Sequence, residues 1–168
     1  MVIIQSTSLT IIDFNKKSNL LGWIVVDDVV MGGQSNGDFS LNKEGYAVFS
    51  GTVSTANKGG FSSLRHRFDK LNVSKFETIK IRVKGDGNKY QFRVKPNQFN
   101  QFSYTTYFQT TTEWETIEIK LTDLIPTFRG RILEMDNFDG KELEEIGFLI
   151  GNKKDEEFKL IIDLIILE

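Results

Sequence analysis

A two-residue alternation of apolar and basic side chains constrains the fold of this chain more than any other feature. It is clearest in Phe76–Lys84, where apolar and basic positions interleave: Ile79, Ile81 and Val83 against Lys80, Arg82 and Lys84. Successive side chains of a β-strand point to opposite faces, so the pattern predicts a strand with one buried and one polar face.

A turn signal follows this run. Gly85-Asp86-Gly87-Asn88 is typical of a β-hairpin, because these residues tolerate positive φ. Alternation then resumes in 90–95. A hairpin centred on Asp86-Gly87 predicts three cross-strand pairs: Ile81 with Phe92, Arg82 with Gln91, and Lys80 with Arg93.

Similar short runs recur along the chain and predict roughly ten strands. Besides 76–84, they are expected at 9–14, from Trp23 onward, and at 39–41, 46–49, 61–68, 90–95, 103–109, 114–121, 146–150 and 158–167. Residues 121–131 are predicted to be a linker and 141–145 a single helical turn. The pattern predicts an all-β fold, an antiparallel β-sandwich of the jelly-roll type. No exact repeat points to a propeller or solenoid.

Length and composition narrow the function classes. The 168 residues fit one domain, expected to span 1–168. A net charge of -2 gives no overall attraction to nucleic acid or to an anionic membrane. The chain contains no cysteine, which excludes disulfides, thiolate metal sites and cysteine nucleophiles.

Targeting and cofactor signals are not found in the sequence. Residues 1–7 lack a secretory or transit pattern, and no apolar run approaches the ~20 residues that span a bilayer. The glycines at 32, 33, 59 and 60 do not follow phosphate-loop or dinucleotide spacing. We therefore expect a soluble cytoplasmic protein without membrane insertion, and we predict no cofactor, no catalytic residue and no metal ligand set.

The densest group of unusual residues lies between Trp23 and Leu64. Trp23 is either a stacking platform for a sugar ring or a core anchor, and the anchor is favoured because valines follow it. Asp27 and Asp28 either bind a cation or sugar hydroxyls, or one of them accepts backbone N–H bonds and shapes the turn into Gly32-Gly33.

Two further polar residues interrupt apolar strands. His66, the only histidine, shares a strand face with Leu64 and Phe68, and a packed or rim position is favoured over a general base. Asp163 lies between Ile161 and Ile165. If that face is buried, its carboxylate needs a partner such as an arginine.

The polar strand faces form the strongest candidate for a binding surface. Its predicted members are Lys80, Arg82, Gln91 and Arg93, joined by Arg65, Arg67, Tyr107 and Gln109 from neighbouring strands. Such a surface suits an anionic sugar, a carboxylate or phosphate ligand, or an acidic partner protein. The alternative is a solvated outer sheet face.

An ordered set of motifs resembles the complex I intermediate-associated protein family. The motifs run along nearly the whole chain: Trp23-x-x-Val26-x-Asp28-x-Val30-Met31-Gly32-Gly33-x-Ser35, Phe49-x-Gly51 with Val53-Ser54, Asn57-x-Gly59-Gly60-Phe61, Gly85-Asp86-Gly87 with Tyr90, Trp114, and Pro126-x-x-Arg129-Gly130. We expect the chain to depart from the mitochondrial members in lacking a presequence. It also reads Lys120-Leu-Thr-Asp-Leu-Ile before Pro126, where relatives tend to have Pro-Phe and a second aromatic.

The resemblance implies a galactose-binding-like jelly roll, similar in architecture to some carbohydrate-binding modules. Mitochondrial members act as assembly factors of the respiratory NADH:ubiquinone oxidoreductase, without known catalysis. It implies a non-catalytic protein that contacts subunits or assembly intermediates of that complex from the soluble side. Alternatives are a carbohydrate- or small-anion-binding module and, third, a glycan-active enzyme. The predicted ligand- or partner-binding residues are Trp23, Asp28, Arg65, Arg82, Gln91, Arg93, Tyr107 and Arg129.

Overall fold

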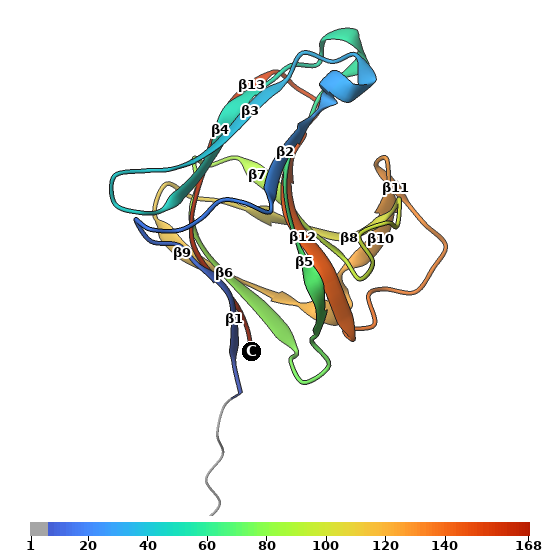
Figure 1. Ribbon diagram of the computed structural model, residues 1–168. Helices are drawn as coiled ribbons and strands as arrows, with labels where there is room; N and C mark the ends of the chain where they lie inside the picture. Colours follow the sequence, from blue (N-terminus) through green and yellow to red (C-terminus); the bar gives the residue numbers. More distant parts are fainter. Residues whose placement is uncertain (1–6) are drawn as a thin grey trace, which may run out of the picture.

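The computed structural model describes residues 7–168, which form two antiparallel β-sheets packed face to face (Figure 1). Sheet A has the order β3-β4-β13-β6-β9, with β1 also paired to β13. Its strands are β1 (Leu9–Asp13), β3 (Asn36–Leu41), β4 (Ala47–Val53), β6 (Thr78–Lys84), β9 (Trp114–Lys120) and β13 (Glu156–Leu167). The expectation about the N-terminus falls mainly on residues 1–6, outside the described part.

Sheet B has the order β11-β10-β8-β7-β12-β5-β2. Its strands are β2 (Trp23–Asp27), β5 (Ser62–Asn72), β7 (Lys89–Lys95), β8 (Ser103–Gln109), β10 (Ile125–Phe128), β11 (Arg131–Ile132) and β12 (Glu142–Ile150). Three short 3-10 helices lie between strands: η1 (Asp28–Met31), η2 (Ala56–Lys58) and η3 (Leu121–Asp123). The chain crosses repeatedly between the sheets, and the prediction of an all-β jelly-roll sandwich is confirmed.

The core fills the space between the sheets. Ile79, Ile81 and Val83 of β6 are fully buried, as their alternation with basic residues predicts. From sheet B, Phe92 and Phe148 meet edge to face with ring centroids 5.6 Å apart. Alternate residues of both sheets therefore make one continuous apolar layer, which holds the outer faces in fixed register.

The predicted hairpin at 85–88 is wrong. β6 pairs with β13 and β9 in sheet A, whereas β7 pairs with β12 and β8 in sheet B. Residues 85–88 therefore cross between sheets. Alternation and turn residues fit either arrangement, because both strands have an apolar face directed at the same core.

Two other local predictions are also wrong. The helical turn expected at 141–145 is the start of β12, where Glu142 pairs with Asn72 and Leu143 is fully buried. The linker expected at 121–131 contains η3 and β10, and β10 pairs with β8. In both segments, pairing with strands distant in the sequence determines the structure, and local residue preference does not predict it.

Candidate functional site

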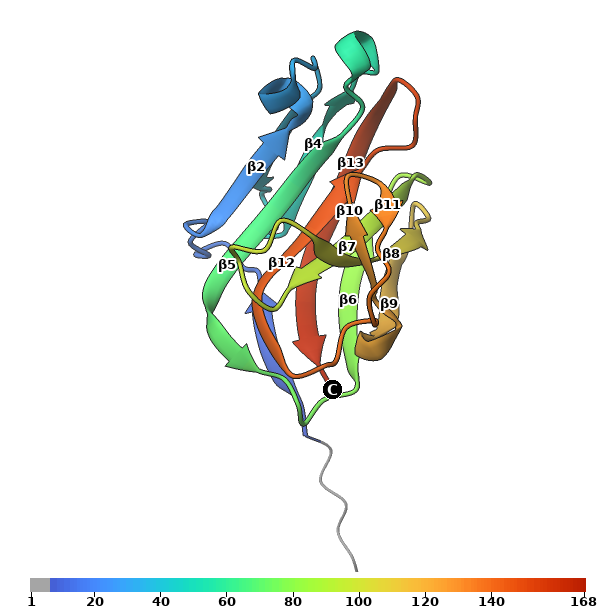
Figure 2. The same cartoon turned by 90° about the vertical axis from the view of Figure 1, so that its right-hand side faces the viewer.

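The outer face of sheet B, directed at the viewer in Figure 2, brings polar side chains of four strands together. The register between the strands aligns the residues of this face in three rows across the sheet. The rows are Ser63, Leu149, Gln91 and Tyr107; Arg65, Gly147, Arg93 and Thr105; and Arg67, Glu145 and Lys95. In Figure 1 the β10–β11 edge of the sheet bends away from sheet A, beside this face. We call these residues the outer face of sheet B.

This face is basic, although the whole chain has a net charge of -2. Arg65, Arg67, Arg93 and Lys95 contribute positive charge, and Glu145 is the carboxylate of the three rows. The strands on either side add apolar side chains: Ile24 on β2 lies opposite Arg65, and Ile125 on β10 lies opposite Thr105. The face thus combines a basic centre with apolar margins.

The third row is internally paired. Arg67 donates from Nε to Glu145 Oε1 at 2.8 Å, and the Glu145 residue is only 5% exposed. Lys95 Nζ donates to the Asn100 carbonyl at 2.8 Å. Burial, and then the nearby Arg65, Arg93 and Arg67, lower the pKa of Lys95, and Glu145 opposes this. The charges of this row already have partners within the protein.

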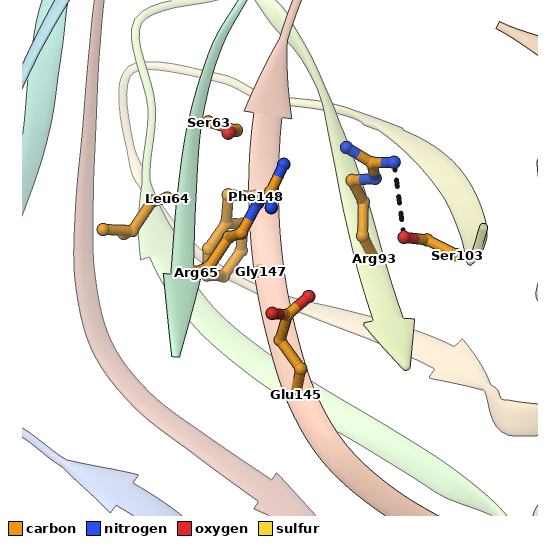
Figure 3. Close-up of a pocket in the computed structure, with 8 residues that line it drawn as sticks. All are labelled: Ser63, Leu64, Arg65, Arg93, Ser103, Glu145, Gly147 and Phe148. Carbon is orange, nitrogen blue, oxygen red and sulfur yellow. Dashed lines mark hydrogen bonds between the residues drawn. The ribbon is translucent and has the colours of Figure 1, made fainter. Parts of the chain in front are cut away.

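The second row is arranged differently, because a glycine separates two arginines. Gly147 pairs with Arg65 on one side and with Arg93 on the other. In Figure 3 the Arg65 side chain extends from β5 across the front of β12, and the Arg93 side chain lies beside it on β7. A small pocket of about 10 Å³ opens there, lined by Ser63, Leu64, Arg65, Arg93, Ser103, Glu145, Gly147 and Phe148. We call it the Gly147 notch.

Arg93 is the most constrained side chain of the notch. Its Nη2 donates to Ser103 Oγ at 3.3 Å, while its buried Nε has no hydrogen-bond partner within the described chain. Burial, and then the positive charge of Arg65, lower the pKa of Arg93 to about 10. The guanidinium is still charged at neutral pH and retains an unused donor.

Four of the predicted binding residues share this outer face: Arg65, Gln91, Arg93 and Tyr107. Tyr107 is 53% exposed, and the Lys89 ammonium lies 4.2 Å from its ring centroid. Arg129 lies apart, exposed in the turn between β10 and β11, with its guanidinium 5.3 Å from the Phe128 ring centroid.

The expectation that Arg82 and Lys80 share this surface is wrong, because β6 belongs to sheet A. Arg82 Nη1 instead contacts Asp163 Oδ2 at 2.7 Å, and its guanidinium lies 4.4 Å from the Trp114 ring centroid. Asp163 is the extra residue of a β-bulge in β13, which places it beside Arg82. The expected arginine partner of Asp163 is thus observed.

Trp23 occupies a core position with 8% exposure. His66 stacks on its indole with centroids 4.3 Å apart and an interplanar angle of 9°, and Phe14 and Phe39 also contact it. Burial lowers the pKa of His66, so the imidazole is neutral at pH 7. The aromatic faces are occupied by protein, which fits the anchor interpretation and not a sugar platform.

Asp28 is fully buried and organises the turns around it. Its carboxylate accepts hydrogen bonds from Ser35 Oγ at 2.5 Å, Ser35 N at 2.9 Å, Gly60 N at 2.5 Å and Phe61 N at 3.2 Å. Burial alone would raise the pKa of Asp28, but these bonds, led by the Ser35 hydroxyl, outweigh it and lower the pKa. Asp28 therefore accepts backbone N–H bonds and shapes the turn, which is one of the two roles that the sequence left open.

The glycines near Asp28 make room for its carboxylate. A Cβ at Gly33 would collide with the Asp28 side chain, and one at Gly59 would lie 2.5 Å from Asp28 Oδ2. The neighbouring Asp27 accepts from Gly37 N at 3.0 Å and Ser62 Oγ at 2.5 Å. The acid-and-glycine stretch is therefore a structural cluster joining η1 to the loops before β3 and β5.

Sequence reasoning missed Lys95, Ser103, Glu145 and Gly147 as members of the candidate site. Glu145 lies in a segment that was expected to be helical, so it was not assigned to a strand face. Gly147 has no side chain that could indicate a binding role. The pairing of β12 with both β5 and β7 brings these residues together. A glycine within an apolar strand was the available signal, since it marks a close approach or an opening.

A second hollow, of about 570 Å³, lies at one end of β7 and β8. Its lining is polar and rich in lysine: Gly87, Asn88, Lys89, Tyr107, Gln109, Gly151, Asn152, Lys153 and Lys154. Tyr107 belongs both to this hollow and to the outer face of sheet B. Across residues 7–168 no cluster of three or more His, Asp or Glu side chains could hold a metal ion.

Comparisons with known proteins give a consistent result. The family model described as Complex I intermediate-associated protein 30 (CIA30) matches residues 12–162. The mouse protein named Complex I intermediate-associated protein 30, mitochondrial, is 24% identical over 97% of this chain, which spans 57% of the mouse protein. None of the helices described in residues 7–168 is long and apolar enough to cross a membrane.

Solved structures share the fold. A family 11 carbohydrate-binding module from Clostridium thermocellum, in complex with a β-1,3-1,4-mixed-linked tetrasaccharide, superposes with a TM-score of 0.72 at 19% identity. The match covers 95% of this chain and 94% of the module. The agarase AgWH50C matches with a TM-score of 0.65 at 11% identity, over 97% of this chain and 25% of the enzyme. At these identities the likeness establishes the jelly-roll architecture.

Proposed function

Because this chain belongs to the Complex I intermediate-associated protein 30 family, we propose that it is a non-catalytic binding protein that associates with assembly intermediates of respiratory complex I. The family match over residues 12–162 carries the proposal. The name of the mouse relative supports the same role, and because this chain spans 57% of that protein, the role is proposed for the shared part. A cytoplasmic location stays a prediction, since the mouse relative is named mitochondrial.

We assign partner docking to the outer face of sheet B. Its basic centre would suit an acidic surface on a partner subunit, mainly through Arg65 and Arg93, because Arg67 and Lys95 already have partners within the protein. Charge complementarity between two faces guides encounter and sets specificity. Apolar margins such as Ile24, which is 42% exposed, add contacts that exclude water.

Affinity capture with charge-reversed variants tests this assignment. The tagged chain, incubated with a detergent extract of the source cells' membranes, is expected to recover subunits of the NADH:ubiquinone oxidoreductase. Recovery should fall at least about tenfold in the Arg65→Glu/Arg93→Glu variant, because two attractive contacts become repulsive at about 1 kcal/mol or more each. Mass spectrometry of the captured subunits provides the measurement.

A matched control keeps the net charge change constant. Lys120→Glu/Lys159→Glu reverses two exposed lysines on sheet A, remote from the candidate face. This variant should recover the subunits as well as the unmodified chain does. Equal losses in both double variants would show that net charge, and not this face, governs capture. No recovery by the unmodified chain would contradict the assembly role itself.

A second candidate is binding of a carbohydrate on the same face. Arg65, Gln91, Arg93 and Tyr107 lie together there, and a structural neighbour binds a tetrasaccharide. Guanidinium and amide donors beside an aromatic ring can bind a polyhydroxylated ligand. Saturable glycan binding in calorimetry, lost in Arg93→Ala and Tyr107→Ala, would favour this candidate. Turnover of a glycan would instead favour a glycan-active enzyme.

A further inference from the structure

We infer that the Gly147 notch is a binding site for a single oxyanion, a carboxylate or a phosphate group, placed between the guanidinium groups of Arg65 and Arg93. The inference deepens the proposed function and rests on it for the biological use of the site. It names the chemical group on the partner that the outer face of sheet B recognises. Three neighbouring strands, β5, β12 and β7, form the site.

Strand register creates the opening. Arg65 on β5, Gly147 on β12 and Arg93 on β7 lie directly opposite one another across the sheet. A Cβ at position 147 would lie 2.5 Å from the Leu64 carbonyl oxygen and 3.5 Å from Arg65 Cα. Glycine therefore permits the close packing of β12 on β5, and Gly147 lines the notch together with Arg65 and Arg93 (Figure 3).

The notch contains an unused buried donor. Arg93 Nε is buried without a hydrogen-bond partner in the described chain, although its Nη2 contacts Ser103. A buried donor that lacks a partner is costly, and an external acceptor would remove that cost. The pocket of about 10 Å³ has room for one oxygen atom, so the rest of a bound ligand would lie over the outer face.

The surrounding charges favour an anion. Arg65 and Arg93 face the notch, with Lys95 and Arg67 in the adjacent row. Glu145 lines the notch as the opposing charge, but it accepts a 2.8 Å bond from Arg67. Arg65 also acts on Arg93 as a like charge that disfavours its protonated form. An oxyanion between them would relieve this repulsion and accept charge-assisted hydrogen bonds from both.

Thermal unfolding of the isolated protein tests the site directly. Inorganic phosphate and acetate are titrated separately, with sodium chloride keeping the ionic strength constant. Binding to the folded state raises its stability, and ligand at ten times Kd shifts the folding equilibrium about elevenfold, or about 1.4 kcal/mol. We expect the unfolding midpoint to rise by roughly 3–6 °C at ten times Kd for a domain of this size, and to continue rising with the logarithm of the anion concentration. A response to phosphate or to acetate identifies which oxyanion is preferred.

Two variants localise the response. Arg65→Gln and Arg93→Gln should each lose the anion-dependent rise, while Lys120→Gln on sheet A should keep it. In chloride alone, the unfolding midpoint of Arg65→Gln should be no lower than that of the protein without substitutions, because the substitution removes the repulsion between Arg65 and Arg93. An unchanged anion response in both notch variants would overturn the inference. So would the absence of any rise beyond the chloride control.

Chemical labelling of arginines in the protein without substitutions tests the site even if the variants do not fold. Phenylglyoxal reacts with arginine, and the preferred anion should slow modification of Arg65 and Arg93 at least threefold. Exposed Arg129 serves as the internal reference and should react at an unchanged rate. Equal protection of all three arginines would contradict a local site.

The two proposals can fail separately. If neither anion binds but respiratory subunits are still captured through the outer face, the oxyanion site is wrong and the docking role stands. If anion binding saturates and depends on Arg65 and Arg93 while no subunit is captured, the site stands and the assembly role fails.

Discussion

Asp28 shows how one buried carboxylate can organise a large part of a small protein. It connects η1 to the segments at Ser35, Gly60 and Phe61 through four hydrogen bonds. Three of the donors are backbone N–H groups, which are costly to bury without a partner. These bonds give the acid at the centre of a glycine-rich stretch a structural role.

Asp28→Asn is expected to destabilise the fold. An amide at this position keeps one acceptor and directs N–H groups at other N–H groups, so the loss should be about 1–3 kcal/mol. Because the hydrogen bonds hold the pKa of Asp28 below its ordinary value of 3.8, its contribution is present above that pH. The contribution disappears as the pH falls through the lowered pKa of the folded state.

Urea unfolding at several pH values measures both effects. The unmodified protein should lose stability in acid more steeply than Asp28→Asn, in which this titration is absent. Asp123→Asn, an exposed acid in η3, serves as the control and should match the unmodified curve. Parallel pH profiles for Asp28→Asn and the unmodified protein would contradict the role of the carboxylate.

Arg82 and Arg93 look equivalent in the sequence but lie on different sheets. Arg82→Ala removes the Asp163 contact and the stacking on Trp114, which should cost about 1 kcal/mol of stability. Subunit capture and the anion response should be unchanged, since β6 is part of sheet A. Denaturant unfolding alongside the capture assay separates the two readouts. Loss of binding in Arg82→Ala would show that sheet A takes part.

At the scale of elements, the crossover at 85–88 matters most for the placement of the site. Asp86 accepts hydrogen bonds from the Tyr90 hydroxyl at 3.1 Å, Lys159 N at 2.7 Å and Asn88 N at 3.0 Å. Lys159 belongs to β13 in sheet A and Tyr90 to β7 in sheet B. The Asp86 side chain thus joins the two sheets where the chain passes between them.

Asp86→Ala should therefore cost about 1–3 kcal/mol, because it leaves the buried Tyr90 hydroxyl without an acceptor. Chemical denaturation of the purified variant measures the loss. Asp139→Ala is a suitable comparison, since Asp139 caps only the nearby Lys141 amide. If Asp86 shaped only a local turn and did not join the two sheets, Asp86→Ala and Asp139→Ala would show similar, small losses of unfolding free energy.

Strand identity was largely predictable, whereas strand pairing was not. Alternation located β6, β7, β8 and β9 well, because burial on one face imposes a period of two. Turn chemistry at 85–88 suggested a hairpin, yet the neighbours of β6 are β13 and β9. Long-range partners depend on how whole strands pack, and a single sequence carries little information about them.

The same distinction applies to the candidate site. Arg65, Gln91, Arg93 and Tyr107 were predictable as polar members of alternating strands. Glu145 and Gly147 were not, because their importance comes from β12 lying between β5 and β7. The notch exists only when three segments distant in sequence are in register.

For the whole molecule, the two sheets differ in their outer surfaces. On sheet A, Arg82 pairs with Asp163, and Lys80 pairs with Glu168 just beyond the end of β13. Sheet B presents two arginines across a glycine, and the buried Arg93 Nε has no hydrogen-bond partner within residues 7–168. The account therefore rests on one claim, that the outer face of sheet B is where this protein meets its partner.

Site-specific photo-crosslinking tests that claim most directly. A photoreactive benzoylphenylalanine is placed at Tyr107, which is 53% exposed on the outer face of sheet B, or at exposed Lys120 on sheet A. After illumination in membrane extracts, the account predicts crosslinks to complex I subunits from position 107 and none from position 120. Crosslinks to those subunits from position 120 but not from position 107 would contradict it.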